Sequence, residues 1–170
     1  MKYTGIVRRL DSLGRIVIPR EYRKMHKIKE SDPLEIIALE NGEILIKKVD
    51  VTAQLISNGT GVLDSLFEAT GGCVMLSNTE KLLIGVGLKK GALADTVLPN
   101  KVKNLIDERR SFCGEGKDMG LECEFVAIST VFCQDVFGAL YLFSATPISA
   151  SDERLLKTAS KILGGVMQKY

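Results

Sequence analysis

The chain has 170 residues, 45% of them hydrophobic, 6% aromatic and 26% charged, which is typical of a globular protein with one large domain or two small ones. Its longest apolar runs, such as Val136–Phe143, fall far short of the roughly 20 residues that a membrane helix needs. The first residues lack an apolar signal core, so we expect a cytoplasmic protein without membrane contact. The cysteines lie far apart without CxxC spacing, which predicts reduced thiols and no metal site.

Positive charge is concentrated near the N-terminus. Residues 1–29 carry nine basic and two acidic side chains, a net charge of +7, although the whole chain has a net charge of only +2. Residues 30–50 have a net charge of −4, and residues 51–170 have a net charge of −1. A cationic segment of this kind is typical of a polyanion-binding surface, and a solvated basic face without a partner is the alternative.

The first half of the N-terminal segment predicts two strands and a helix. The β-branched runs at 5–10 and 14–18 flank a turn that contains Gly14, which favours a pair of strands. Pro19 is expected at the first position of a short helix ending near Met25, because its fixed φ suits that position.

The second half predicts a hairpin. Strands are expected at 34–39 and 43–48, joined around Asn41-Gly42, where both residues tolerate positive φ. Residues 1–50 therefore form a module with the order β-β-α-β-β. Fifty residues bury too little surface to be stable alone, and open strand edges recruit other chains. We therefore expect a second copy of the chain to complete the module.

Residues 51–170 predict an α+β domain with a helix at each end. The first helix, at 52–69, has one apolar stripe, but Gly59 and Gly61 predict that it bends or starts late. Ser151 is the expected N-cap of the last helix. The two end helices could pack on each other over one face of the sheet or join a second subunit in a bundle. The segments between them are strands at 73–76, 81–86, 123–133 and 136–143, a helix at 101–110 and a loop at 113–120.

Residues 5–24, with the core Leu13-Gly-Arg-Ile-Val-Ile-Pro19, closely resemble the N-terminal module of AbrB-type transition-state regulators. Residues 32–36 and 45–48 match this family as well. The resemblance implies a swapped-hairpin barrel that two chains build together. The layout of the whole chain is similar to that of sporulation regulators of this family, in which a C-terminal GAF-like domain has an antiparallel sheet with flanking helices.

The resemblance implies a bacterial transcription regulator, an activator or a repressor, that binds double-stranded DNA as a homodimer or as a homotetramer formed through its C-terminal helices. Arg8, Arg15, Arg23 and Lys24 fall on positions that contact DNA in the family, and we add Arg9 and Arg20 from charge alone. Guanidinium groups suit this task because they pair bidentately with phosphate oxygens or with guanine. Lys24, Tyr22 and His26 depart from the residues usual in the family.

The resemblance also implies that the second domain could hold a small-molecule ligand, which the sequence does not identify. Residues 87–120 would cover the pocket, and Cys73, Met75, Leu83 and Phe125 would line it, unless these four side chains simply form the core. No cofactor is expected.

Two other functions compete with transcription control. The N-terminal fold also occurs in antitoxins, which bind DNA and neutralise a toxin, although these carry a short tail in place of 120 regularly patterned residues. An enzyme is not expected, because no nucleophile, base and orienting residue occur together. His26 has no partner for catalysis and is predicted to lie at a helix end, and Gly85-Val86-Gly87 lacks a phosphate-binding pattern.

Overall fold

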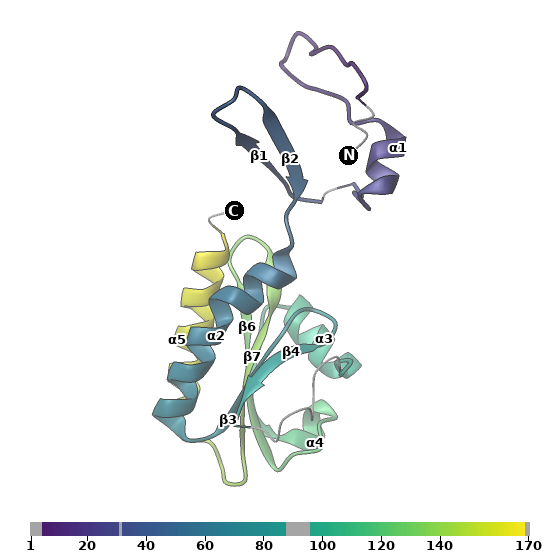
Figure 1. Ribbon diagram of the computed structural model, residues 1–170. Helices are drawn as coiled ribbons and strands as arrows, with labels where there is room; N and C mark the ends of the chain where they lie inside the picture. The colour runs from purple at the N-terminus through teal and green to yellow at the C-terminus, as the bar shows by residue number, and fades with distance from the viewer. Residues whose placement is uncertain (1–4, 31, 88–95, 169–170) are drawn as a thin grey trace. The chain divides into compact units, whose positions relative to one another are not determined.

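The structure, a computed structural model, describes residues 5–30, 32–87 and 96–168. The chain divides into two compact units, Met1–Val49 and Asp50–Tyr170. Each unit has a sheet of its own, with two strands in the first and five in the second (Figure 1). None of the described helices is long and apolar enough to cross a membrane.

The first unit contains one short helix and one hairpin. The predicted helix is confirmed as α1 (Arg20–Met25), although Pro19 is its N-cap and not its first residue. The predicted hairpin is confirmed as β1 (Leu34–Ala38) and β2 (Ile44–Lys48), which pair antiparallel. Gly42 has φ +81° at the turn between them, a conformation that a side chain would strain.

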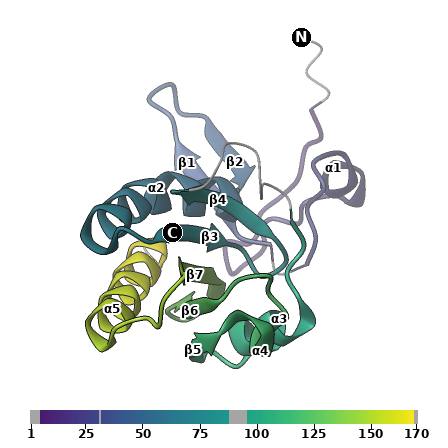
Figure 2. The same cartoon turned by 90° about the horizontal axis from the view of Figure 1, so that it is seen from below.

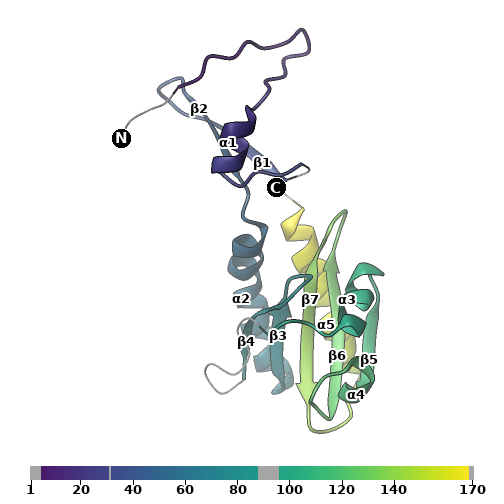
Figure 3. The ribbon, with the colours of Figure 1, turned by 90° about the vertical axis from the view of Figure 1, so that its right-hand side faces the viewer.

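Residues 5–18 differ from the prediction, since the single chain forms no strand ladder there. These residues form a long extended loop with a turn in its middle (Figure 3). The turn is closed by two hydrogen bonds, from Gly14 N–H to Asp11 C=O at 3.0 Å and from Asp11 N–H to Arg15 C=O at 3.1 Å. The physical reason is that a strand is defined by its hydrogen-bonded neighbour. No described segment of the same chain occupies that position.

The second unit is built on one antiparallel sheet with the strand order β4-β3-β7-β6-β5. The strands predicted at 123–133 and 136–143 pair antiparallel on either side of Gln134-Asp135, with Thr130 opposite Ala139 in their register. The elements are α2 (Val51–Thr70), β3 (Cys73–Ser77), β4 (Leu82–Val86), α3 (Asn100–Asp107), β5 (Ser111–Glu115), α4 (Gly116–Met119), β6 (Phe125–Phe132), β7 (Val136–Ser144) and α5 (Ala150–Met167).

The helices cover the two faces of this sheet separately. Figure 2 shows α2 and α5 side by side on one face and α3 and α4 on the other. Leu55 of α2 and Leu163 of α5 are buried in one core cluster together with Leu140 of the sheet. A second cluster contains Val102 and Ile106 of α3 with Tyr141 of β7. Of the two arrangements left open for the end helices, packing on each other over one face of the sheet is found within the single chain.

Helix α2 begins at Val51 and is continuous to Thr70, so the predicted late start is wrong. Gly59 is buried, and a Cβ atom at this position would lie 2.3 Å from a methyl group of Leu76. The glycine therefore permits close packing of the helix on the sheet. The helix begins where the Asp50 carboxylate accepts a hydrogen bond from Ala53 N–H at 3.0 Å.

Two other local predictions require correction. The segment 113–120 is not a loop, because residues up to Glu115 belong to β5, which pairs with β6, and α4 follows directly. The N-cap of α5 is Ser149 and not Ser151, since the Ser149 hydroxyl accepts from Asp152 N–H at 3.1 Å.

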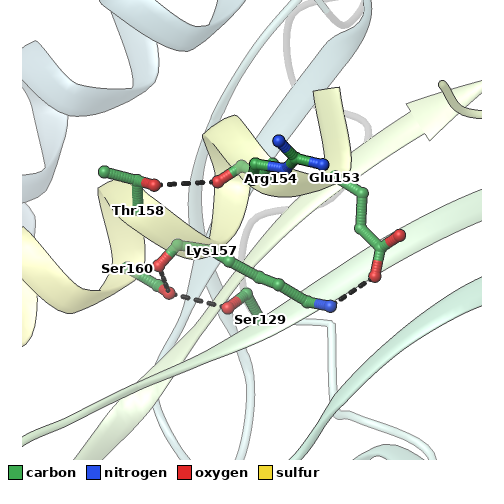
Figure 4. A network of polar contacts seen from close by, with 6 residues as sticks. All are labelled: Ser129, Glu153, Arg154, Lys157, Thr158 and Ser160. Carbon is green, nitrogen blue, oxygen red and sulfur yellow. Dashed lines mark hydrogen bonds and ion pairs between the residues drawn. The ribbon is translucent and has the colours of Figure 1, made fainter. Parts of the chain in front are cut away.

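A buried pair of hydroxyls ties α5 to the sheet (Figure 4). Ser129 of β6 and Ser160 of α5 are 5% and 1% exposed, and their oxygens lie 2.6 Å apart. The Ser160 hydroxyl also donates to the Lys157 carbonyl at 3.0 Å. Because a hydroxyl has a single hydrogen, Ser129 is the donor within the pair.

Candidate nucleic-acid interface

The six basic residues singled out from the sequence are all solvent-exposed in the first unit. Arg8 and Arg9 precede the turn at Asp11–Gly14, and Arg15 follows it. The remaining three lie in α1, where Arg20 is three and four residues from Arg23 and Lys24, a spacing that places them on neighbouring positions of one helix face.

Arg15 is oriented by the turn residue Asp11. One oxygen of the Asp11 carboxylate accepts from the backbone N–H groups of Leu13 and Arg15, at 2.9 and 2.8 Å. The other oxygen accepts from Arg15 Nε at 2.7 Å. The pKa of the Asp11 carboxyl lies below its ordinary value, first because of the backbone bond from Arg15 and then because of the side-chain bond from Arg15. The same carboxylate thus shapes the loop and holds the arginine.

The other five basic side chains have no ion pair or side-chain hydrogen bond with any residue that the structure describes. The lysines of the β1–β2 hairpin differ. Lys47 pairs with Glu35 at 3.0 Å and Lys48 with Asp32 at 2.7 Å. Positive charge is therefore neutralised on the hairpin and left available along residues 8–24.

The first unit also exposes many apolar side chains. Val7 is 92% exposed, Val17 76% and Ile44 70%. A groove of about 410 Å³ lies between residues 5–22 and strand β2. It is lined by Gly5, Ile6, Arg8, Ile16, Val17, Ile18, Pro19, Tyr22, Ile44 and Ile46. A folded unit that leaves this much apolar surface in water has an incomplete core.

The sole histidine lies where it was predicted. His26 is the C-cap of α1 and is exposed. Within the described ranges, no group of three or more His, Cys, Asp and Glu side chains could hold a metal ion.

The second unit contains a cavity of about 520 Å³ between the sheet and the segments 96–99 and 120–123. Cys73 and Met75 line it, as predicted. Leu83 and Phe125 do not, which corrects the prediction. Of the expected covering segment 87–120, residues 96–99 and 120 line the cavity, and residues 88–95 lie outside the described part of the chain.

Strand alternation explains both errors. Leu82 lines the cavity, so its neighbour Leu83 points to the opposite face, where it packs against the cluster under α2 and α5. Phe125 precedes Val126, which belongs to the cavity-side cluster, and therefore faces away as well. Tyr141 and Phe143 also line the cavity although they were not predicted to, and their alternate positions in an apolar run were the available signal.

The N-terminal part of the chain matches one protein family, and two regulatory proteins are similar to the chain in sequence. The family described as "Antidote-toxin recognition MazE, bacterial antitoxin" matches residues 7–53. Transition state regulatory protein AbrB of Bacillus subtilis is 42% identical over 79 residues, 45% of this chain and 78% of that protein. Stage V sporulation protein T of the same organism is 34% identical over 111 residues, 65% of this chain. The match spans only 62% of the length of that protein.

The likeness to solved structures concerns the second unit. The GAF-B domain of DevS from Mycobacterium smegmatis superimposes with a TM-score of 0.58 at 14% identity, covering 68% of this chain and 93% of the domain. At this identity the likeness shows the fold alone, which is the predicted GAF-like fold with an antiparallel sheet and flanking helices. Because transition state regulatory protein AbrB is matched over 78% of its own length at 42% identity, the chain belongs to the family of that protein.

Proposed function

We propose that this chain is a bacterial transcription regulator of the transition-state or sporulation type, which binds double-stranded DNA through residues 8–24. The observation that carries the proposal is a set of exposed basic side chains, five of which have no ion pair or side-chain hydrogen bond within the described part of the chain. These five are Arg8, Arg9, Arg20, Arg23 and Lys24. Family membership supports a regulator and not an enzyme, because the relative that matches over most of its length is a regulatory protein by name.

Duplex DNA is the polyanion that these side chains suit best. Arginine forks bind phosphates and guanine edges, and the segment 5–30 has no cluster of aromatic residues on which unpaired bases could stack. Asp11 binds Arg15 through Nε, which leaves the terminal nitrogens of Arg15 without a hydrogen bond or ion pair among the described residues, while it fixes the direction of the side chain.

The test is a binding titration of the full-length protein on duplex DNA at several salt concentrations. If the oligomer contacts about six to ten phosphates, affinity should fall by about 10³ to 10⁵ between roughly 50 and 200 mM salt. Arg15→Ala should weaken binding to a selected site roughly tenfold or more. The matched control is Arg154→Ala, an exposed arginine of α5, which should bind normally. Affinity that is independent of salt would overturn the proposal.

The proposed active form is at least a dimer. A second copy whose residues 5–18 insert beside β2 would cover the apolar groove of the first unit and supply the missing strand partners. This accounts for the exposed Val7, Val17 and Ile44, which would otherwise face water.

A dimer of dimers would form through the end helices. The side of α2 and α5 that faces away from the sheet carries an apolar groove of about 250 Å³. Its lining residues are Gly61, Val62, Ser65, Leu66, Ala69, Leu155, Ala159 and Ile162. Ile162 is 60% exposed and Leu155 39%, and the equivalent helices of another copy would bury both.

An antitoxin is the second candidate, favoured by the family match to residues 7–53. Antitoxins of this fold usually carry a short tail, whereas this chain has a compact second unit at Asp50–Tyr170, which favours transcription control. Stoichiometric co-purification of a small protein whose toxicity the chain suppresses would favour the antitoxin instead.

The second unit is proposed to be regulatory. A cavity of about 520 Å³ has the size of a small-molecule site, and only two residues, Val49 and Asp50, separate the end of β2 from the start of α2. A change in the packing of α2 could therefore reach the first unit through a very short connection.

A further inference from the structure

The walls of the cavity in the second unit are mostly apolar, with Thr96 and Glu122 as the polar side chains among the described lining residues. The strands contribute Cys73 and Met75 from β3, Leu82 from β4, and Tyr141 and Phe143 from β7. Met75 is 3% exposed and Leu82 7%, so these residues lie deep in the domain. A ligand would therefore contact mainly carbon and sulfur atoms.

The aromatic wall of the cavity, formed by Tyr141 and Phe143, has no free hydroxyl, because the hydroxyl of Tyr141 is already hydrogen-bonded within the protein. The rings of Tyr141 and Phe143 lie parallel within 9°, with centroids 6.0 Å apart. The Tyr141 hydroxyl bonds to Ser77 Oγ at 2.9 Å. Among the described residues, no buried side-chain nitrogen or oxygen lacks a hydrogen-bond partner, so a ligand is not needed to satisfy a buried side chain of this wall.

The charge of the lining decides which ligands can enter. Among the described lining residues none is lysine, arginine or histidine, and Glu122, the one acidic member, is exposed. An anion placed in this cavity would lose its hydration without gaining a counter-charge from the described lining residues, which is costly. Burial raises the pKa of the Cys73 and Cys123 thiols, so both sulfurs are neutral at physiological pH and add no charge of their own.

We propose that this cavity binds an uncharged, largely apolar small molecule, planar enough to lie against the partly exposed Phe143 ring, and that it excludes anions. The inference rests on the regulatory role proposed for the second unit and names the class of ligand. If the cavity excludes anions, it does not bind nucleotides or other phosphorylated metabolites.

The two cavity cysteines provide the test, because Cys113 and Cys133 lie outside the cavity and serve as internal controls. Full-length protein is alkylated with neutral iodoacetamide at mildly alkaline pH, and the rate at each cysteine is followed by peptide mass spectrometry. The probes are 2-naphthol and 2-naphthalenesulfonate, which share a ring system and differ in charge. We expect 2-naphthol to slow alkylation of Cys73 and Cys123 severalfold and to leave Cys113 and Cys133 unchanged. The sulfonate should protect none of the four.

A charge reversal at the rim supplies a second measurement. Glu122→Lys replaces an exposed side chain and should allow the sulfonate to protect Cys73 and Cys123, while Glu122→Gln should change its protection much less. Equal protection by both probes in the natural protein, no protection by 2-naphthol, or continued exclusion of the sulfonate by Glu122→Lys would each overturn the proposal.

DNA binding is measured on the same samples, which separates the two proposals. Protection by 2-naphthol without any DNA binding would overturn the proposed function and leave the ligand class standing. DNA binding without protection would do the reverse.

Discussion

The Asp11 carboxylate and Arg15 are joined twice, through the backbone N–H of Arg15 at 2.8 Å and through its Nε at 2.7 Å. The two residues are four apart, on either side of the turn at the tip of the extended segment. The loop therefore presents Arg15 in a defined direction, and the charge of Asp11 serves orientation although it reduces the net positive charge of the segment.

Asp11→Asn should weaken binding to DNA although it removes a negative charge. The amide cannot accept both backbone bonds and also hold the guanidinium, so Arg15 would lose its fixed direction. We expect a loss of roughly two- to fivefold, the size typical of an exposed ion pair. Fluorescence anisotropy on duplex DNA measures it. In an Arg15→Ala background the same change should have no further effect, and an additive loss would mean that Asp11 acts independently of Arg15.

The pKa of Asp11 should lie below its ordinary value of 3.8 in the folded protein. Since the folded value is lowered, stabilisation by the ionised carboxylate is complete above 3.8 and is lost as the pH falls through the folded pKa. A carboxyl-carbon NMR titration measures this value. Arg15→Ala should raise the pKa only partway, because the backbone N–H of residue 15, the largest cause, remains. A complete return to 3.8 would contradict this assignment.

Ser160→Ala should destabilise the protein more than Ser129→Ala. Replacing Ser160 leaves the buried Ser129 hydroxyl without its acceptor, at a cost of about 1–3 kcal/mol. Replacing Ser129 leaves Ser160 bonded to the Lys157 carbonyl, and the cost should be about 1 kcal/mol or less. Urea denaturation measures both. Thr158→Ala, which removes an exposed hydroxyl of the same helix, is the control. The opposite order would show that Ser160 is the donor of the pair.

Ile44→Glu tests the dimer proposed for the first unit. The side chain is 70% exposed in the single chain, so in a monomer the change should alter stability by only about 0.5 kcal/mol. If a second copy covers the groove, a charge there would be buried without a partner, and the dimer should dissociate. Sedimentation velocity measures the mass of the species present. A dimer of unchanged affinity would remove the groove from the interface.

Ile162→Glu should remove the larger assembly and preserve the smaller one. Ile162 lines the groove on α2 and α5, and Thr158, which is exposed on the same helix, does not. Light scattering should therefore report a halved mass for Ile162→Glu and an unchanged mass for Thr158→Glu. If the natural protein is already a dimer at high concentration, the proposed tetramer does not form.

The sequence by itself determined most of the local structure, because local signals are strong where residues act on their own backbone. The hairpin at Asn41-Gly42, the helix after Pro19 and the apolar stripe of α2 all follow from conformational preference and periodicity. The cationic character of residues 8–24 is likewise a property of composition and remains a prediction as a DNA contact.

The tertiary structure decided which residues share a surface. Whether Leu82 or Leu83 faces the cavity depends on how β4 pairs with β3, and an apolar run of residues does not encode that choice. Gly59 is a second example. Its local preference predicts a weaker helix, but the close packing of α2 on Leu76 leaves no room for a larger side chain at this position. Two polar pairs, Asp11 with Arg15 and Ser129 with Ser160, likewise form only because the folded chain brings their side chains together. No periodic pattern in the sequence indicates either pair.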